Sequence, residues 1–417
     1  MTTTDLAEMP NQYTDRFKGF MARTIAVARR RIEAAGIDAP IADEARERAQ
    51  NVLSYALQDG ESWAATRDLL LTMAPKMEIA AYRDEWMQCL QTGIAQSQQQ
   101  EDHLAEIELQ FRGGYLYRLS SNYASARAML SISAELAMTL EQKPLQARAL
   151  NQLAYLAWQQ HRYEEAEQFA NTAIAMLDEM SLEKAMSLSA LGLVATDLSR
   201  YAEAEQYHQE ALLIRTHHAA QKEMAWSLQN LGLALRDQGK TNTAIEHFKQ
   251  ALHLLDKVYD PFHEAIIQMN LGGAYNVKGE HRQALEIFSS AEEILHRIAD
   301  DLNLAKLLTL RGLCYLALQQ AKEAEQAFST SAKLFQQLND RSWYLNAFDG
   351  LGISYLEQEK YDQALAIFES IFSQLPEIEG TPAHKYLTAT ITIQIEQARS
   401  KQVVRGKSVY LPPKNQD

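Results

Sequence analysis

The sequence predicts an all-α fold, a solenoid of antiparallel helix pairs. Three observations predict it: a short motif returns seven times at a nearly constant step, apolar residues follow helical spacing within each copy, and glycine and proline are scarce, with 17 and 9 in 417 residues. Scarce helix breakers favour long, uninterrupted helices over strands and turns. Because tandem repeats stack into one continuous structure, the length does not call for several globular domains.

The repeat is defined by a small residue and by an alanine twelve positions later. Successive small residues are 40, 38, 40, 40, 40 and 40 positions apart, a regularity that chance does not produce. The small residues are Gly114, Ala154, Gly192, Gly232, Gly272, Gly312 and Gly352, and the alanines are Ala126, Ala166, Ala204, Ala244, Ala284, Ala324 and Ala364.

Each copy of the repeat is predicted to be two amphipathic helices joined by a polar turn, because apolar residues recur at i, i+3, i+4 and i+7. The small residues let the two backbones approach, and large residues fill the space between copies. The aromatic residues are Tyr117, Tyr275, Tyr315 and Tyr355, three positions after the glycine, and Phe248, Phe288, Phe328 and Phe368, four after the alanine.

The junctions between copies carry their own signals. Asp260, Asp300 and Asp340 recur just before a first helix, where a carboxylate can cap free N–H groups. The third copy has His208 where phenylalanine is usual, so we expect less uniform packing there. The 38-residue step is expected to shorten the connection near Met180 and to perturb the superhelix.

The repeat resembles the tetratricopeptide repeat over residues 102–376. The pattern is clearest in the fifth copy, as Leu271, Gly272, Tyr275, Gly279, Ala284 and Phe288. The usual repeat of that family has about 34 residues, and the 40-residue step resembles the longer version found in kinesin light chain, Pins-type adaptors and bacterial signalling proteins. The resemblance implies a right-handed superhelix with partners bound along its concave face.

The resemblance and the ends of the chain suggest four parts. We expect an N-terminal helical segment over residues 1–100 that ends in a degenerate half-repeat cap, seven repeats over 101–378, a capping helix over 379–399, and a basic, disordered tail over 400–417. The tail could dock into a neighbouring copy of the chain, so a homo-oligomer stays open.

Near the N-terminus, residues 16–31 hold six basic side chains and no acidic one. The favoured interpretation is a solvated basic face whose apolar stripe (Phe17, Phe20, Met21, Ala28, Ile32) packs on the helices that follow. The alternative is a basic amphipathic helix that binds a membrane surface, an acidic partner or RNA.

Composition and motifs argue against several functions. A net charge of −14 repels phosphate backbones, so no nucleic-acid partner is expected. No apolar run approaches the ~20 residues of a membrane span, which leaves the cytoplasm as the default location. Cys89 and Cys314 stand apart in apolar stretches, which favours small buried side chains over ligands. Without a recognised catalytic or metal-binding motif, we expect no enzyme, metal or cofactor.

The resemblance places candidate groove residues at fixed positions around the small residue of each first helix. Asn230 and Asn270 match the asparagine that contacts a bound peptide's backbone in long-repeat relatives, and an amide offers both a donor and an acceptor. Their predicted neighbours are Trp226, Gln229, Arg236 and Asn276, and a second cluster comprises Arg118, Asn151, Tyr155 and Trp158. Trp158 and Trp226 could instead be ordinary packing residues.

Two functions follow from these expectations. The first is a non-catalytic adaptor that holds a peptide or partner protein in its groove. The second is a ligand-sensing regulator whose solenoid changes curvature when it binds a small peptide or metabolite and then controls an effector.

Overall fold

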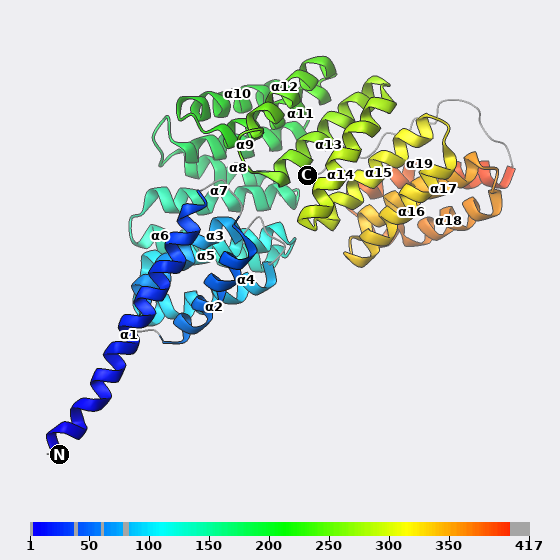
Figure 1. Cartoon of the computed structure of the whole chain (residues 1–417). Coiled ribbons are helices and arrows are strands. Elements are labelled where there is room, and N and C mark those ends of the chain that lie inside the picture. The colour runs from blue at the N-terminus through cyan, green and yellow to red at the C-terminus, as the bar shows by residue number, and fades with distance from the viewer. Residues whose placement is uncertain (1–2, 37–40, 60–61, 78–82, 401–417) are drawn as a thin grey trace. The chain divides into compact units, whose positions relative to one another are not determined.

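The computed structural model describes residues 3–36, 41–59, 62–77 and 83–400, which form nineteen α-helices, a single 3₁₀ turn and no strand (Figure 1). This confirms the predicted all-α fold. The chain divides into two compact units. The N-terminal unit runs to Leu231 and includes Leu254–Asp260, whereas the C-terminal unit comprises Gly232–His253 and the chain from Pro261 onward.

Four helices precede the repeats: α1 (Thr3–Ala34), α2 (Asp43–Asp59), α3 (Trp63–Met77) and α4 (Arg83–Gln99). The predicted apolar stripe of α1 is buried at Met21, Ala28 and Ile32, whereas Phe20 is exposed, and the side chain of Phe17 lies outside the described part. The stripe therefore packs on α2 and α3, as favoured. The basic tail over 400–417 lies outside the described residues from position 401.

The repeats form helix pairs whose members pack against each other within each unit. In chain order the helices are α5 (His103–Leu119), α6 (Tyr123–Thr139), α7 (Lys143–Gln159), α8 (Tyr163–Ile174), α9 (Leu182–Asp197), α10 (Tyr201–His217), α11 (Gln221–Asp237), α12 (Thr241–Leu255), α13 (Pro261–Lys278), α14 (His281–Ile298), α15 (Asp301–Ala317), α16 (Ala321–Gln337), α17 (Arg341–Glu357) and α18 (Tyr361–Gln374). The 3₁₀ turn η1 (Leu375–Ile378) and α19 (Pro382–Ser400) follow.

The small residue of each first helix receives the side chain sixteen positions later. In the C-terminal unit this partner is a fully buried phenylalanine, as with Gly272 and Phe288, where a Cβ on the glycine would collide with the ring. In the N-terminal unit Leu130 faces Gly114 and His208 faces Gly192. The predicted close approach of the two helices is therefore present in both units, but the residue that fills it differs.

The turns repeat as regularly as the helices. In the turn after most helices one residue has a positive φ, from Glu101 with φ 53° to Glu359 with φ 60°, usually twenty positions after the previous one. This left-handed conformation stops a helix and satisfies its last carbonyls. Asp300 and Asp340 cap the next helices as predicted, since each carboxylate accepts a hydrogen bond from a backbone N–H three residues on, at 3.1 Å.

The 38-residue step has a different effect from the one expected. The connection near Met180 is not shortened: α8 ends early, at Ile174, and the stretch before α9 is longer than the turns between other helices. Ser181 then caps α9 by accepting a hydrogen bond from the N–H of Glu183. The two missing residues are therefore taken from the helix rather than from the connection.

The helix contacts show which side of each unit lies inside the curve. Adjacent first helices touch, as α5 does α7 and α7 does α9, and as α13 does α15 and α15 does α17. Within the described part of each unit, adjacent second helices such as α6 and α8 make no such contact. Because repeats lie closer on the inner side of a bend, the first helices form the inner face of each unit.

None of the described helices is long and apolar enough to cross a membrane.

Candidate functional site

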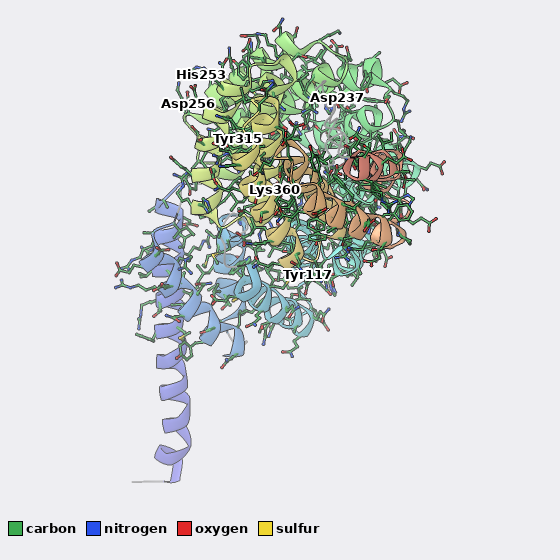
Figure 2. All side chains as sticks on the ribbon, turned by 90° about the vertical axis from the view of Figure 1, so that its right-hand side faces the viewer. Tyr117, Asp237, His253, Asp256, Tyr315 and Lys360 are labelled. Carbon is green, nitrogen blue, oxygen red and sulfur yellow. The ribbon has the colours of Figure 1, made fainter. Side chains whose placement is uncertain are left out.

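The predicted groove residues divide between the two units. Arg118, Asn151, Tyr155, Trp158, Trp226, Gln229 and Asn230 belong to the N-terminal unit, and Arg236, Asn270 and Asn276 belong to the C-terminal unit. The two asparagines that led the prediction therefore lie in different units, and each group is described by itself. Figure 2 shows the described side chains on the ribbon, with Tyr117 marking α5.

Arg118 and Tyr155 meet on the inner face of the N-terminal unit. The Arg118 guanidinium lies 5.7 Å from the ring centroid of Tyr155 and 5.3 Å from that of Tyr115, a cation–π geometry. It donates hydrogen bonds to Gln152 Oε1 at 3.0 Å and to Gln159 Oε1 at 3.3 Å. Desolvation lowers the pKa of Arg118, and the neighbouring tyrosines act in the opposite direction.

The hydroxyl of Tyr155 reaches a second arginine. Arg215, from α10, interacts electrostatically with this hydroxyl and donates a hydrogen bond to Ser227 Oγ. Only 2% of Arg215 is exposed, and desolvation lowers its pKa as well. Burial raises the pKa of Tyr155, so the phenol stays protonated and can donate.

Asn151 is buried between helices. Its Nδ2 donates to the backbone oxygen of Glu183 at 2.9 Å, and its Oδ1 accepts from Ser187 Oγ at 2.6 Å. These bonds join α7 to α9. In this structure the side chain of Asn151 serves the packing of two first helices.

Trp158 and Trp226 both donate their indole N–H to an aspartate. Trp158 Nε1 lies 2.8 Å from Asp197 Oδ2, and Trp226 Nε1 lies 3.1 Å from Asp260 Oδ2. Trp158 is buried and Trp226 is half-buried. The geometry supports the packing role that was the alternative for these residues, more strongly for Trp158.

The remaining candidates differ in exposure. Asn230 is half-buried and forms no hydrogen bond with any described residue, and Gln229 beside it has a buried Oε1 without a hydrogen-bond partner there. In the C-terminal unit, Asn270 is only 3% exposed, and its Nδ2 likewise has no hydrogen-bond partner among the described residues.

The last two candidates are half-buried side chains of the C-terminal unit. Arg236 pairs with Asp237 at 2.9 Å, and Asn276 Oδ1 lies 2.6 Å from His281 Nδ1. Both side chains thus already have local partners.

The exposure of a side chain on a first helix depends on its position relative to the small residue. Side chains directly after the small residue or four positions after it are mostly half-buried, as for Tyr115, Arg118 and Tyr155. Those two or three positions before it are mostly buried, as for Asn151 and Asn270. The accessible part of the predicted groove therefore comes mainly from the half of each first helix that follows the small residue, and Asn230, two positions before Gly232, is an exception.

A charged cluster that the sequence did not single out continues the inner face. Glu108 on α5 pairs with Arg112 and Arg148, and the Arg148 guanidinium lies 4.2 Å from the ring centroid of Phe111. Burial raises the pKa of nearby Glu183, with Arg148 acting in the opposite direction. The sequence could have indicated this cluster, because Glu108 and Arg148 lie six positions before their small residues and Arg112 lies two positions before Gly114.

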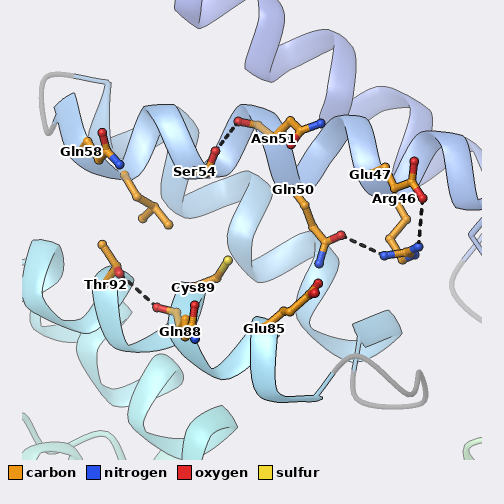
Figure 3. Close-up of a pocket in the computed structure, with 11 residues that line it drawn as sticks. Arg46, Glu47, Gln50, Asn51, Ser54, Gln58, Glu85, Gln88, Cys89 and Thr92 are labelled. Carbon is orange, nitrogen blue, oxygen red and sulfur yellow. Dashed lines mark hydrogen bonds and ion pairs between the residues drawn. The ribbon is translucent and has the colours of Figure 1, made fainter.

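A pocket of about 710 Å³ lies between α2 and α4 (Figure 3). Its walls are mainly amide, hydroxyl and charged side chains, including Arg46, Gln50, Gln88 and Thr92. Cys89 also lines it and is half-buried rather than buried as expected, and burial raises the pKa of this thiol. Cys314 is fully buried, as predicted. Among the described residues, no three His, Cys, Asp or Glu side chains gather as metal ligands would.

The solved structures that are similar to this chain in fold include the following two. A signal transduction ATPase with numerous domains and a tetratricopeptide repeat sensor, from Pyrococcus horikoshii, has a TM-score of 0.58 and 15% identity over 87% of this chain and 55% of that one. A Rap protein complexed with competence and sporulation factor has a TM-score of 0.53 and 16% identity over 86% and 99%. No curated protein sequence matches this chain.

Two sequence models, both described as tetratricopeptide repeat, match the chain. One matches residues 183–257, 223–297, 263–337 and 303–375, and the other matches residues 111–181. Together these ranges cover more than half of the chain and include the helix pairs whose glycine and partner ring are described above. The chain therefore belongs to the tetratricopeptide repeat family.

Proposed function

We propose that the protein is a non-catalytic binding scaffold that holds an extended peptide segment of a partner on the inner face of its N-terminal unit. The observation that carries this proposal is that side chains on the inner face are partly accessible and have hydrogen-bonding capacity to spare. Arg118 and Tyr155 are half-buried and adjoin, and the half-buried amide of Asn230 has hydrogen-bonding groups without a partner among the described residues.

The chemistry of these side chains suits an extended peptide. Tyrosine and arginine are the residue types that most often anchor interfaces, because they bring large contact areas at low entropic cost. An asparagine amide can satisfy a backbone N–H and a backbone C=O at once. Because adjacent first helices pack on one another, these groups are held on a preformed surface, which lowers the cost of binding.

The test uses the full-length protein, immobilised and exposed to a pool of random decapeptides. We expect it to retain a subset of sequences, and Asn230→Ala to weaken binding of a resynthesised peptide about fivefold without lowering the melting temperature. Asn171→Ala, on the exposed side of α8, is the matched control and should leave affinity unchanged. Retention of no peptide, or equal effects of both variants, would contradict the proposal.

One structural link favours the second candidate function, a ligand-sensing regulator. Asp102, which caps α5, also accepts hydrogen bonds from Trp63 Nε1 and Arg67 Nη1 of α3, both at 2.9 Å. The first helix of the repeats is thus tied to the N-terminal helices, so a ligand that displaces α5 would displace α3. The similar Rap protein was solved in complex with a factor.

Small-angle scattering with and without a retained peptide separates the two functions. A regulator should become measurably more compact on binding, and this change should be lost when Asp102→Asn with Arg67→Gln breaks the link. Unchanged dimensions at saturating peptide would leave the static scaffold as the function.

A further inference from the structure

Helix α1 carries two stripes of side chains on different sides. The first stripe is buried where α1 packs on α2 and α3, and none of its members is more than 8% exposed. These members are Met21, Ile25, Ala28 and Ile32. The second stripe, which we call the outer stripe, is exposed along its whole length. Its members are Phe20, Arg23, Val27, Arg30 and Ala34.

The outer stripe has the spacing of a helix–helix contact. Its residues follow one another at steps of three, four, three and four, which keeps them on one face of the helix. Its large apolar members are well exposed, 57% for Phe20 and 46% for Val27. Apolar side chains that recur every seven residues, here at Phe20, Val27 and Ala34, are typical of a surface that packs against another helix. The described residues leave this surface uncovered.

The arginines of the outer stripe lack acidic partners. Arg23, Arg30 and their exposed neighbour Arg31 have no carboxylate oxygen within 4.0 Å among the described residues. By contrast, Arg29 of the same helix pairs with Asp68 of α3 at 2.9 Å. The outer stripe therefore presents uncompensated positive charge, in a chain whose net charge is −14.

Three other occupants fit the outer stripe less well than an acidic helix does. A second copy of α1 would bring its own outer stripe, which adds arginines and no carboxylate. A membrane surface takes up a continuous apolar face, whereas Arg23 and Arg30 stand between the apolar members of the stripe. A nucleic acid is repelled by the net charge of the chain and makes no use of the exposed apolar side chains.

We propose that the outer stripe of α1 binds an amphipathic helix of a partner protein whose acidic residues recur every seven positions. Apolar side chains of that helix would pack on Phe20, Val27 and Ala34, and its carboxylates would pair with Arg23 and Arg30. Each guanidinium can donate two parallel hydrogen bonds to a carboxylate. The outer stripe lies outside the repeats, so this interaction does not depend on peptide binding to the inner face.

The test exposes the immobilised full-length protein to three pools of displayed helices, each three heptads long. In every pool one position of each heptad carries varied apolar residues. The position three residues later is fixed as glutamate in the first pool, as glutamine in the second and as lysine in the third. We expect the glutamate pool to be retained at least about fivefold more than the glutamine pool, and the lysine pool least. This preference should shrink as salt is raised, because exposed charges are screened.

Charge-changing variants then assign the preference to the outer stripe. Arg23→Gln with Arg30→Gln should abolish the preference for glutamate, and Arg23→Glu with Arg30→Glu should transfer it to the lysine pool. The melting temperature should not change, because both side chains are exposed. Arg282→Gln with Arg297→Gln, at exposed positions of α14, removes the same charge and is the matched control that should keep the preference.

The apolar members of the outer stripe are tested separately. Phe20→Ser with Val27→Ser should lower retention of the glutamate pool about tenfold, because the contact loses apolar area. Leu213→Ser changes an exposed apolar side chain of α10 and should leave retention unchanged.

The inference is overturned by equal retention of the glutamate and glutamine pools, by retention of no pool, or by a preference that survives Arg23→Gln with Arg30→Gln. Sedimentation with vesicles of phosphatidylserine and phosphatidylcholine checks the membrane as occupant. Vesicle binding that depends on the same two arginines would assign the outer stripe to a lipid surface and also overturn the inference. The peptide-binding function of the inner face stands or falls by its own test.

Discussion

The two units use the same helix pair and fill it differently. In the C-terminal unit the space beside each glycine is taken by a fully buried phenylalanine, as at Phe288, Phe328 and Phe368. In the N-terminal unit the same space holds Leu130 or His208, and on the inner face Arg118 contacts neutral glutamine oxygens instead of a carboxylate. The repeat geometry therefore tolerates a less apolar interior. The less apolar interior belongs to the N-terminal unit, whose inner face is the proposed binding surface.

The largest difference should appear when the filling side chain is removed. Phe288→Ala should lower the free energy of unfolding by about 3–5 kcal/mol, because a large apolar side chain leaves a cavity. His208→Ala should cost about 1–2 kcal/mol, since it also removes two buried ring nitrogens that have no hydrogen-bond partner among the described residues. Urea unfolding of both variants checks this, and equal losses would erase the distinction between the units.

A buried acid in the C-terminal unit gives the next largest effect. Asp349 on α17 is fully buried, and neither carboxylate oxygen accepts a hydrogen bond of ordinary geometry from the described residues. Burial raises its pKa to about 7, with Gln394 of α19 acting in the opposite direction. Because the folded pKa lies above the unfolded value, stability is full below about pH 4 and is lost as pH rises toward 7.

Asp349→Asn should therefore stabilise the protein, with little effect at pH 4 and a gain that reaches at most about 4 kcal/mol above pH 7. The measurement is the free energy of unfolding from pH 4 to 8. Asp362→Asn changes an exposed acid of α18 and should show no such trend. A gain that did not grow with pH would show that the Asp349 carboxyl is not desolvated as described.

The smallest effect should come from making the N-terminal unit resemble the C-terminal one. His208→Phe restores the ring found at Phe248 and should raise stability by about 1–2 kcal/mol at pH 7. Burial lowers the pKa of His208 to about 3, so wild-type stability declines as pH falls from about 6.5 toward 3. The free energy of unfolding of the variant should fall less between pH 7 and pH 4, because it has no imidazole to protonate. Urea unfolding curves at the two pH values measure this difference.

A destabilised His208→Phe would contradict the comparison in an informative way. It would mean that the imidazole occupies a space too small for a benzene ring, and that the third repeat is closed around the histidine. Gly192 would then be the residue that sets the limit, since the ring of His208 lies directly against it.

The fold could be predicted from the sequence because its signals are local and repeated. The 40-residue step, the glycine that receives a ring and the capping aspartates all act within one or two helices. The early end of α8 at Ile174 escaped prediction, because a missing pair of residues can be absorbed by a helix or by a connection, and the pattern does not say which.

The candidate site was predictable only in part, for a physical reason. Arg118 and Tyr155 were found because they occupy fixed positions after the small residue. Arg215 was missed because it comes from a second helix and meets Tyr155 only through the packing of α10. Asn151 was placed in the groove, and its burial depends on Ser187 and Glu183 from the following first helix.

Hydrogen exchange on the full-length protein, with and without a retained peptide, tests the central claim most directly. If the inner face of the N-terminal unit is the binding surface, the peptide should slow amide exchange in α5, α7 and α9 and leave α6 and α8 unchanged. Protection confined to the second helices or to the C-terminal unit would contradict the account.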